Sequence, residues 1–490
     1  MKLSEFLPTT SALQIEDVMY DSREPLENSV FYCLSGLTHD GHQFAAQAIS
    51  NGAIAIVASR PLVELENQAE IIYVDDVESI FYESVAKFFD YPSKKLYMVA
   101  VTGTNGKTST AIMTYRLVSK VTKAAYIGTL GVLFGNESLP YEYTTPDYVS
   151  INRYLKTMVD AGVKFCVLEA SSQGLEQNRL HGIDFNVVVF TNLTHEHLDF
   201  HGTMENYYQA KKKAFVDLDF EDRAVLNIDD KYGRRLNEEL EIPKITYSKE
   251  DETADYYLEE LETDLKQSIF SLKTPEKSLT FTTDVRGHYN IDNLIDALIV
   301  CKQFGIDLEK LSLEPLIIGN IEGRVDIVQR PSFPTVVVDY AHTPDGFTKV
   351  FQFALSLVPE DGDIIAVFGS AGRRDASKRK LLGRIADEFA DRIILTEEDQ
   401  RDEDLSAINK MIREGIKNKP SVEIVNRYEA IHQAIVTALP HDIILILGKG
   451  REQFNARGSQ PDDYIGDYQA VLEIFNSIQA EEENNGNSNQ

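Results

Sequence analysis

Short apolar runs alternate with amphipathic stretches along most of the chain. The runs at 98–101, 165–168 and 187–190 contain only apolar side chains, and each is followed by a polar segment. Uninterrupted apolar runs of this length are typical of strands that helices cover on both faces of a parallel sheet. The pattern therefore predicts an α/β fold whose sheets are mainly parallel.

The number and spacing of these runs predict three domains. A chain of 490 residues exceeds what one hydrophobic core usually serves, since domains commonly have ~150 residues. We expect a small α/β domain at 1–93, a central parallel-sheet domain at 94–325 and a C-terminal domain at 326–480. Pro92 marks the first boundary, because proline disfavours a helix at the residue before it.

The C-terminal domain is predicted to be Rossmann-like, because apolar runs near 335, 364, 393 and 443 alternate with helical patterns. Its first run is not followed by a GxGxxG pattern, so we expect no dinucleotide. Residues 253–283 are polar with short alternating runs and predict an antiparallel hairpin at a sheet edge. The acidic, Asn-rich tail at 481–490 is expected to be disordered.

Charge and cysteine usage exclude several classes of protein. With 78 acidic and 48 basic residues, the chain has a formal net charge of -30, which repels nucleic acid and anionic membranes. The three cysteines lie far apart without a CxxC pair, which argues against a disulfide framework. No apolar run approaches ~20 residues, and the start lacks the apolar core of a signal peptide. We expect a cytoplasmic protein without membrane insertion, and we take it to be a monomer.

The loop after the first central strand has the composition of a phosphate-binding loop. Residues 102–108 have the sequence Thr-Gly-Thr-Asn-Gly-Lys-Thr between an apolar run and a helical pattern. Gly103 and Gly106 let the backbone aim N–H groups at oxyanions, Lys107 supplies a positive charge, and the Thr108 hydroxyl suits magnesium. We predict that this loop holds ATP phosphates; the alternative is an ordinary turn from strand to helix.

Two further strands end in side chains that suit a divalent metal. Glu169 follows the run at 165–168, and His195 and His197 follow the run at 187–190. Glu169 and His197 are oxygen and nitrogen donors that can join Thr108 around a metal. The histidine pair also suits zinc, and a glutamate at this position is commonly a cap or a surface group. Magnesium beside ATP phosphates is the better match, because its shell prefers few protein donors together with phosphate and water.

Together these motifs resemble those of the Mur ligase family, the ATP-dependent amide-bond-forming enzymes of peptidoglycan synthesis. The short spacing between the loop glycines and the segment 191–202 carry the likeness in the centre of the chain. In the first domain, Asp-Ser-Arg at 21–23 and Asp-Gly-His at 40–42 resemble the MurE-type ligases, although the first of these alone is more often a turn. The resemblance extends from about 21 to 467 and implies the three-domain fold described above, with a central domain like those of P-loop ATPases.

The resemblance assigns three sets of ligand contacts by position. It implies ATP contacts from Gly103, Thr104, Asn105, Gly106, Lys107, Thr108, Ser109, Asn290, Asn293 and Arg324. It implies contacts to UDP-MurNAc-dipeptide from Tyr20, Ser22, Leu37, Thr38, His39, Thr144, Thr145, Ser171, Gln177 and Arg179. It implies two magnesium sites with the ligands Thr108, Glu169, His197 and Lys211. Asn290 and Asn293 equally suit turn and N-cap roles, because Asn side chains stabilise both.

Lys211 has a separate role by resemblance. Considered alone, the three lysines at 211–213 are typical of a solvated helix face. Lys211 falls where MurE-type enzymes carry a lysine carbamate formed with carbon dioxide, so the catalytic set is Lys107, His197 and Lys211. A carbamate is anionic and suits a second magnesium, and its formation requires that the free amine first lose its proton.

The identity of the added amino acid stays open at this stage. Relatives that add diaminopimelate carry Asp-Asn-Pro-Arg where this chain has Glu-Asp-Gln-Arg at 398–401, so only the arginine is shared. Glu452 also lies where those relatives keep a glutamate. The expected contacts to the amino acid are Arg374, Glu398, Asp399, Arg401, Gly448 and Glu452. Diaminopimelate, lysine and another amine acceptor in a divergent paralogue remain the alternatives.

The implied function is an ATP-dependent ligase that adds the third amino acid to UDP-MurNAc-L-Ala-D-Glu through an acyl phosphate. Two other hypotheses compete with it. A catalytically silent regulatory homologue would not need the intact set of Lys107, Thr108, Glu169, His197 and Lys211. An enzyme like folylpolyglutamate synthase shares the central domain and would not need the first domain.

Overall fold

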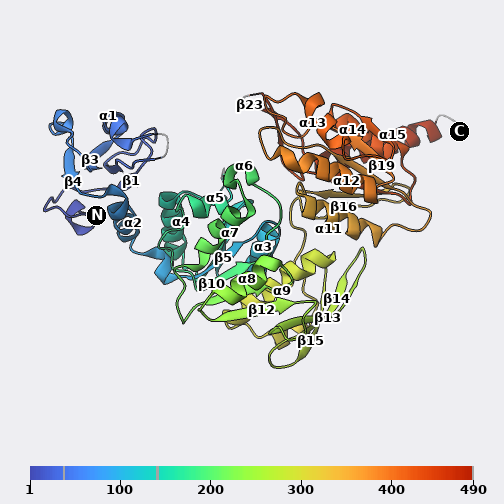
Figure 1. The fold of residues 1–490 in the computed structure, drawn as a ribbon, viewed down its shortest axis with the longest axis horizontal. Coiled ribbons are helices and arrows are strands. Elements are labelled where there is room, and N and C mark those ends of the chain that lie inside the picture. The colour runs from blue at the N-terminus through green and yellow to red at the C-terminus, as the bar shows by residue number, and fades with distance from the viewer. Residues whose placement is uncertain (37–38, 140–142, 459, 488–490) are drawn as a thin grey trace. The chain divides into compact units, whose positions relative to one another are not determined.

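The computed structural model describes residues 1–36, 39–139, 143–458 and 460–487 (Figure 1). The chain forms two compact units. Unit 1 comprises Met1–Val101, Val118–Val188 and Lys213–Arg223, and unit 2 comprises Thr102–Leu117, Val189–Lys212 and Ala224–Gln490. The domain boundaries expected from the sequence stay predictions, because neither compact unit ends at residue 93 or residue 325.

The amino-terminal part of unit 1 is a small parallel sheet with helices. Its strands follow the order β1-β2-β3-β4, and all three pairings are parallel. Buried side chains that include Phe31, Ala45 and Ile56 form one cluster between the sheet and the first helix. The elements are η1 (Leu3–Glu5), β1 (Asp17–Met19), β2 (Ser29–Tyr32), η2 (Gly41–Phe44), α1 (Ala45–Ser50), β3 (Ala53–Ala58), η3 (Val63–Leu65), β4 (Glu70–Tyr73), α2 (Val77–Phe88) and η4 (Pro92–Lys95). The predicted α/β character is confirmed.

The rest of unit 1 holds the first strands of the central region in the order β5-β9-β6-β7-β8. β9 pairs in parallel with β5 and β6, whereas β6, β7 and β8 pair antiparallel. Every residue of β9 is buried, as its uninterrupted apolar run predicts. The elements are β5 (Tyr97–Thr102), β6 (Ala124–Gly128), β7 (Gly131–Phe134), β8 (Glu137–Leu139), α4 (Tyr148–Asp160), β9 (Phe165–Glu169), α5 (Ser172–Glu176) and η5 (Lys213–Phe215).

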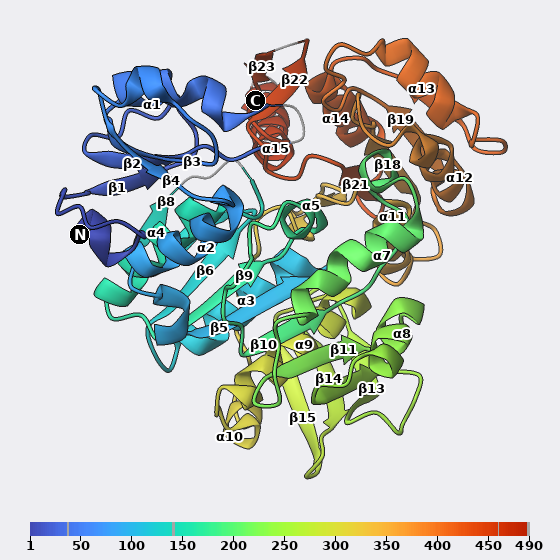
Figure 2. The ribbon, with the colours of Figure 1, turned by 60° about the vertical axis from the view of Figure 1, so that its left-hand side comes forward.

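Unit 2 begins with the glycine-containing loop after β5 and helix α3. It continues with strands in the order β15-β14-β13-β12-β11-β10. β11, β12 and β13 pair in parallel, and β13, β14 and β15 form an antiparallel meander (Figure 2). The meander confirms antiparallel pairing in 253–283 but has three strands, not the two of the predicted hairpin. The elements are α3 (Lys107–Ser119), β10 (Val187–Phe190), α6 (Leu198–His201), α7 (Met204–Lys212), β11 (Arg223–Asn227), α8 (Lys231–Glu239), β12 (Lys244–Ser248), β13 (Tyr256–Thr263), β14 (Ser268–Lys273), β15 (Ser278–Thr283), α9 (His288–Gln303) and α10 (Leu308–Ser312).

The carboxyl-terminal part of unit 2 is a six-stranded sheet with helices on both faces. Its order is β16-β17-β21-β18-β19-β20, in which only the β16 pairing is antiparallel. One apolar cluster includes Phe351 of α11 and Leu382 of α12, and a second includes Ile431 of α14 and Phe475 of α15. The elements are β16 (Asp326–Val328), β17 (Thr335–Asp339), α11 (Pro344–Leu355), β18 (Ile364–Phe368), η6 (Ala376–Lys378), α12 (Arg379–Phe389), β19 (Arg392–Leu395), α13 (Leu405–Arg413), β20 (Ser421–Glu423), α14 (Arg427–Thr437), β21 (Ile443–Leu447), β22 (Phe454–Arg457), β23 (Gln460–Asp463) and α15 (Asp467–Asn487). The predicted Rossmann-like layering is confirmed.

The last helix differs from the sequence prediction. Helix α15 continues to Asn487, so the expectation of a disordered tail from 481 is wrong for residues 481–487. Alanine, glutamate and glutamine at 479–483 are good helix formers, and they extend a helix that is anchored by buried Phe475. Over the described ranges of the chain, no helix is long and apolar enough to cross a membrane.

Candidate functional site

The loop between β5 and α3 requires glycine at two positions. Gly103 has φ +149°, and a Cβ there would lie 1.9 Å from Oγ1 of Thr191. Gly106 has φ +90°, and a Cβ there would lie 2.3 Å from Oδ1 of Asn293. Both positions therefore exclude a side chain. The loop leads directly into the first turn of α3, and the N-terminus of a helix is where backbone N–H groups can bind phosphate.

The two predicted catalytic lysines meet at this loop. Lys107 Nζ donates hydrogen bonds to the carbonyl oxygens of Gly103 and Thr104 at 3.0 and 2.9 Å. Lys211, on α7, donates from Nζ to the same Gly103 carbonyl at 2.7 Å and is only 1% exposed. Burial and the nearby charge of Lys107 hold the pKa of Lys211 well below its usual value. The solvated face that three successive lysines would suggest therefore does not include Lys211, whereas Lys213 is exposed.

His197 lies in the same surroundings. It immediately precedes α6 and has φ +56°, in the left-handed region that few non-glycine residues adopt. Burial, together with the charges of Lys107 and Lys211, lowers its pKa to about 2. The imidazole is therefore neutral at physiological pH and keeps a nitrogen lone pair for a metal. His195 instead places Nε2 2.9 Å from the Ser377 hydroxyl.

Glu169, the remaining predicted metal ligand, lies at the end of β9 in unit 1. It is fully buried, and its Oε1 accepts hydrogen bonds from the Tyr126 hydroxyl at 2.5 Å and from the Thr129 backbone N–H at 2.9 Å. Its Oε2 accepts from the Thr129 hydroxyl at 3.2 Å. These partners fix the orientation of the carboxylate, as a second shell does for a metal ligand.

The donor set of unit 2 suits magnesium bound together with nucleotide phosphates. Thr108 is 4% exposed and offers a hydroxyl oxygen, and His197 offers a neutral imidazole. Among the residues that the structure describes, no group of three or more His, Cys, Asp and Glu side chains is placed to hold a metal ion. A divalent ion at this loop would therefore depend on phosphate oxygens for most of its shell, which is how magnesium usually binds.

A pocket of about 370 Å³ opens beside the loop within unit 2. Of the predicted ATP contacts, Asn105, Gly106, Ser109, Asn290, Asn293 and Arg324 line it. Asn293 places Oδ1 3.4 Å from the Thr110 hydroxyl and its Nδ2 3.4 Å from Oδ1 of Asn290, so both amides face this region. Arg324 lies over the Tyr340 ring at 5.0 Å and donates from Nη2 to the Thr108 hydroxyl at 3.4 Å.

Several lining residues of this pocket were not predicted from the sequence, among them Asp345, Lys349, Lys249 and Asp296. Asp345 accepts a hydrogen bond from Asn105 Nδ2 at 2.8 Å and pairs with Lys349 at 2.8 Å. Lys249 and Asp296 line the pocket on another side. Asp345, Lys349 and Lys249 reach the pocket from segments that the predicted ATP contacts do not include, whereas Asp296 follows Asn293 by three residues on α9.

The predicted dipeptide contacts of unit 1 form one hydrogen-bonded group. Thr145 donates from its hydroxyl to Ser171 Oγ at 2.9 Å and receives a hydrogen bond from the Ser171 backbone N–H at 2.9 Å. Arg179 donates to the Thr145 carbonyl at 2.7 Å and to Gln177 Oε1 at 2.6 Å. Thr144 joins the group through the Thr129 hydroxyl at 3.2 Å. The structure therefore brings these residues together.

The predicted UDP contacts of the first domain are partly described. Ser22 is 6% exposed and donates to Gln47 Oε1 at 3.0 Å, and His39 is exposed. Tyr20 is 39% exposed. Burial of its hydroxyl end is the main cause that raises the pKa of Tyr20, and the charges of Asp147 and Arg179 act on it as well. Tyr20 therefore lies near the group around Arg179. Leu37 and Thr38 lie outside the described residues.

The predicted amino-acid contacts surround a buried lysine. Lys449 is fully buried and donates to Asp399 Oδ1 at 2.8 Å and to Glu452 Oε2 at 3.0 Å. Tyr340 donates from its hydroxyl to Glu452 Oε1 at 2.7 Å. Glu398 is 6% exposed, and a Cβ on Gly448 would lie 2.2 Å from its Oε2. The sequence predicted contacts at the neighbouring Gly448 and Glu452 but did not predict Lys449 as the cation of this group.

The two predicted arginines differ in their surroundings. Arg401 has φ +52° and donates from Nη1 to the Gly372 carbonyl oxygen at 2.6 Å. Its backbone N–H donates to the Ala456 carbonyl at 2.8 Å, so both main chain and side chain are anchored. Arg374 is exposed. In this structure the Arg401 guanidinium is therefore held by backbone carbonyl oxygens.

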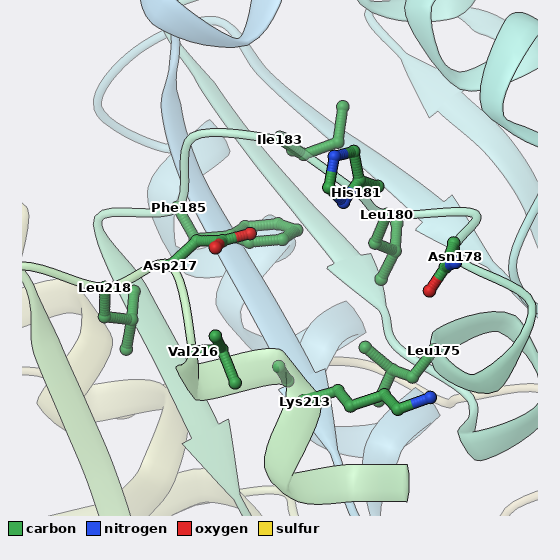
Figure 3. Close-up of a pocket in the computed structure, with 11 residues that line it drawn as sticks. Leu175, Asn178, Leu180, His181, Ile183, Phe185, Lys213, Val216, Asp217 and Leu218 are labelled. Carbon is green, nitrogen blue, oxygen red and sulfur yellow. The ribbon is translucent and has the colours of Figure 1, made fainter. Parts of the chain in front are cut away.

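A second pocket, of about 230 Å³, lies in unit 1 between the segment after α5 and the segment after η5 (Figure 3). Its lining includes the apolar side chains of Leu180, Ile183 and Phe185 and the charged side chains of Lys213 and Asp217. None of the residues predicted for a site lines it.

Comparisons with known proteins define the family. Residues 101–301 match the Mur ligase middle domain, and residues 323–450 match the Mur ligase, glutamate ligase domain. The UDP-N-acetylmuramoyl-L-alanyl-D-glutamate–2,6-diaminopimelate ligase 1 of Clostridium acetobutylicum is 36% identical over 451 residues, which are 91% of this chain and 92% of the relative. The corresponding ligase of Geobacillus kaustophilus is 36% identical over 448 residues, or 90% of each chain. A solved structure of a 2,6-diaminopimelate ligase of this type aligns with a TM-score of 0.67 at 31% identity and covers 97% of both chains.

The chain belongs to the Mur ligase family. It is an ATP-dependent ligase that forms amide bonds, and the resemblance seen in the loop, the metal motif and the first domain is confirmed. The catalytically silent alternative is therefore set aside.

Proposed function

We propose that the protein joins meso-diaminopimelate to the D-glutamate carboxylate of UDP-MurNAc-L-Ala-D-Glu. The observation that carries the proposal is the hydrogen bond from Lys211 Nζ to the Gly103 carbonyl oxygen. It places a buried amine with a lowered pKa at the loop that is expected to bind phosphates. Relatives named for 2,6-diaminopimelate ligation, which align along nine-tenths of the chain, support the choice of substrates.

The reaction has two steps in which atoms and charges balance. A carboxylate oxygen of the dipeptide attacks the γ-phosphorus of ATP, so that an acyl phosphate forms and ADP leaves. The amine nitrogen of the amino acid then attacks the acyl carbon, inorganic phosphate leaves and the nitrogen loses a proton. Most of the catalytic effect in such chemistry comes from alignment and charge neutralisation.

The residues of unit 2 supply that alignment. Backbone N–H groups of 106–108, at the start of α3, bind the phosphates, and Lys107 neutralises them once its amine exchanges the Gly103 and Thr104 carbonyls for phosphate oxygens. Arg324 borders the same pocket and adds a second cation. Magnesium, when bound, neutralises the phosphate charge, and Thr108, Glu169 and His197 are its proposed protein ligands.

Lys211 is the proposed site of a carbamate. Carbamate formation requires a neutral amine, and burial beside Lys107 lowers the pKa of Lys211 in the direction that provides it. The neutral nitrogen attacks carbon dioxide, forms an N–C bond and releases one proton, so a neutral amine becomes an anionic carbamate. The anion would hold a second magnesium and offset the positive charge of Lys107.

One observation favours lysine as a second candidate substrate. Arg401 is engaged by the Gly372 carbonyl, whereas the acidic groups Asp399 and Glu452 surround Lys449. An Arg401 guanidinium that stays on the backbone is not available to a distal carboxylate, and lysine has no such carboxylate.

An amino-acid panel tests the proposal. Phosphate release is measured with ATP, magnesium and UDP-MurNAc-L-Ala-D-Glu in the presence of each amino acid. Phosphate release that depends on meso-diaminopimelate supports the proposal. Release that depends on lysine would instead identify lysine as the added amino acid. Release with neither amino acid, in an enzyme that still binds ADP, would exclude both substrates.

A further inference from the structure

The nucleotide pocket of unit 2 contains a buried acid without a role in the mechanism above. Asp296 lies on α9 and lines the pocket with Asn290 and Asn293, which precede it at intervals of three residues. Side chains three apart lie on neighbouring positions of one helix face, so the three polar groups form a continuous wall. Asp296 is 2% exposed.

Asp296 differs from the other acids of this pocket in its partners. Asp292 accepts hydrogen bonds from the Tyr247 hydroxyl at 2.6 Å and from Lys249 Nζ at 2.8 Å. Asp230 accepts from the backbone N–H groups of Leu193 and Tyr232. Oδ1 of Asp296, in contrast, has no hydrogen-bond partner among the described residues. A buried acceptor without a partner is costly, so its retention at a pocket wall indicates that a ligand supplies the donor.

The position along the pocket indicates which part of the nucleotide faces this wall. The phosphates belong at the loop, where Gly106 packs against Asn293. The base then faces the amide and carboxyl groups of α9, because amides and acids match the donor and acceptor edges of a base. Adenine carries an exocyclic amino group that donates two hydrogen bonds.

We propose that Asp296 accepts a hydrogen bond from the 6-amino group of adenine and is a specificity-determining residue for ATP. The inference rests on the proposed function, since it assumes that this pocket holds the ATP of the ligation reaction. It assigns to one side chain the discrimination between bases that carry a 6-amino group and bases that lack it.

The protonation of Asp296 agrees with this role. Burial, and secondarily the charge of Asp292, raises the pKa of Asp296 well above its usual range. A neutral carboxyl group keeps one acceptor oxygen and gains one O–H donor, so it can pair with the amino group and an adjacent ring nitrogen. A base can then bind without an uncompensated buried charge beside it.

The test compares ADP with purine riboside 5′-diphosphate, which lacks only the 6-amino group. Binding of each to the full chain is measured by titration calorimetry with magnesium. The wild-type protein is expected to bind ADP about 10- to 100-fold more tightly, because the analogue leaves the buried acceptor unpaired. Asp296→Ala should bring this ratio close to one, and Asp296→Asn, which keeps an acceptor, should retain most of it.

Asp307→Asn is the matched control, because Asp307 is an exposed acid at the start of α10 outside the pocket lining, and asparagine can keep its N-cap role. It should keep the discrimination ratio, and the melting temperature without nucleotide shows that each variant is folded. A purely structural role of Asp296 would change that melting temperature and leave the ratio intact, which would overturn the inference. If the wild-type protein fails to bind ADP at all, the proposed function itself fails.

Discussion

Lys211 and Gly103, which are 108 positions apart in the chain, are joined by a hydrogen bond of 2.7 Å from the lysine Nζ to the glycine carbonyl. The lysine is buried, and the second lysine of the loop, Lys107, bonds to the same carbonyl oxygen at 3.0 Å. Two amines thus share one acceptor at the position where phosphates are expected. Burial and the charge of Lys107 oppose protonation of Lys211, and phosphate anions that enter this site would neutralise Lys107.

Lys107→Ala and His197→Ala should each lower phosphate release at least about 100-fold, because they remove a charge partner of the phosphates and a metal ligand. The variants should retain the melting temperature of the wild-type protein within a few degrees, since neither side chain belongs to an apolar core cluster. Phosphate release in the full ligation mixture is the measurement. Turnover near the wild-type rate in either variant would contradict its catalytic role.

Lys211→Ala should be nearly inactive and partly recover when a small carboxylate such as acetate or formate is added. The added anion can occupy the space that the carbamate fills and bind the same cation. Lys212→Ala, in the next position and half-buried, is the control and should be active without additive. A fully active Lys211→Ala enzyme in buffer free of carboxylates would remove the carbamate assignment.

Stability should depend on pH through Lys211. Its pKa is lowered on folding, whereas the unfolded chain has the usual value of ~10.4, so the unfolded state binds more protons between the two values. The free energy of unfolding therefore rises with pH in that window and levels off above ~10.4. Lys211→Met should be more stable than the wild type at pH 7 and show a smaller rise.

The measurement is the apparent melting temperature from pH 7 to pH 9.5 in buffer freed of carbon dioxide. Other titrating groups are common to both proteins, so the difference between the two curves isolates Lys211. Parallel curves would show that the amine is protonated in the folded state across this range.

Gly106→Ala should weaken ADP binding about tenfold or more. The substitution places a methyl group 2.3 Å from Asn293 Oδ1 at a backbone φ of +90°, and strain of this kind costs ~1–3 kcal/mol. Gly305→Ala is a matched control, because its φ is +93° and no atom lies within 4 Å of the new Cβ. Both variants carry the backbone strain, so a difference between them in ADP titration reports the contact between the new Cβ at position 106 and Asn293. Equal ADP affinities in the two variants would contradict the prediction.

Arg401→Ala tests how the amino acid is recognised. If diaminopimelate is the substrate, its distal carboxylate needs a cation, and the loss of a charge-assisted pair costs ~1.5–3 kcal/mol or at least about tenfold in kcat/KM. Lysine use should stay flat or rise in the same variant. Arg373→Ala, on an exposed side chain paired with Asp402, controls for loss of positive charge nearby. An unchanged ratio between the two amino acids would mean that Arg401 stays on the Gly372 carbonyl during catalysis.

The sequence alone determined the fold class and much of the phosphate site. Uninterrupted apolar runs predicted buried parallel strands, and β9 has no exposed residue. The glycines of 102–108 predicted a constrained loop, and Gly103 and Gly106 have no room for a side chain. The apolar runs and the glycines are local signals, whereas the side chains that leave no room at the two glycines, Thr191 and Asn293, come from distant segments.

The tertiary structure decided which distant side chains share a partner. Lys211 was typical of a solvated helix face by its neighbours, and only packing against the loop buried it and lowered its pKa. Lys449 became the cation between Asp399 and Glu452, although it is 50 positions from one of them. The sequence does not distinguish Asp296 from Asp292 on the same helix, because the lack of a hydrogen-bond partner for Oδ1 of Asp296 shows only after the chain has folded.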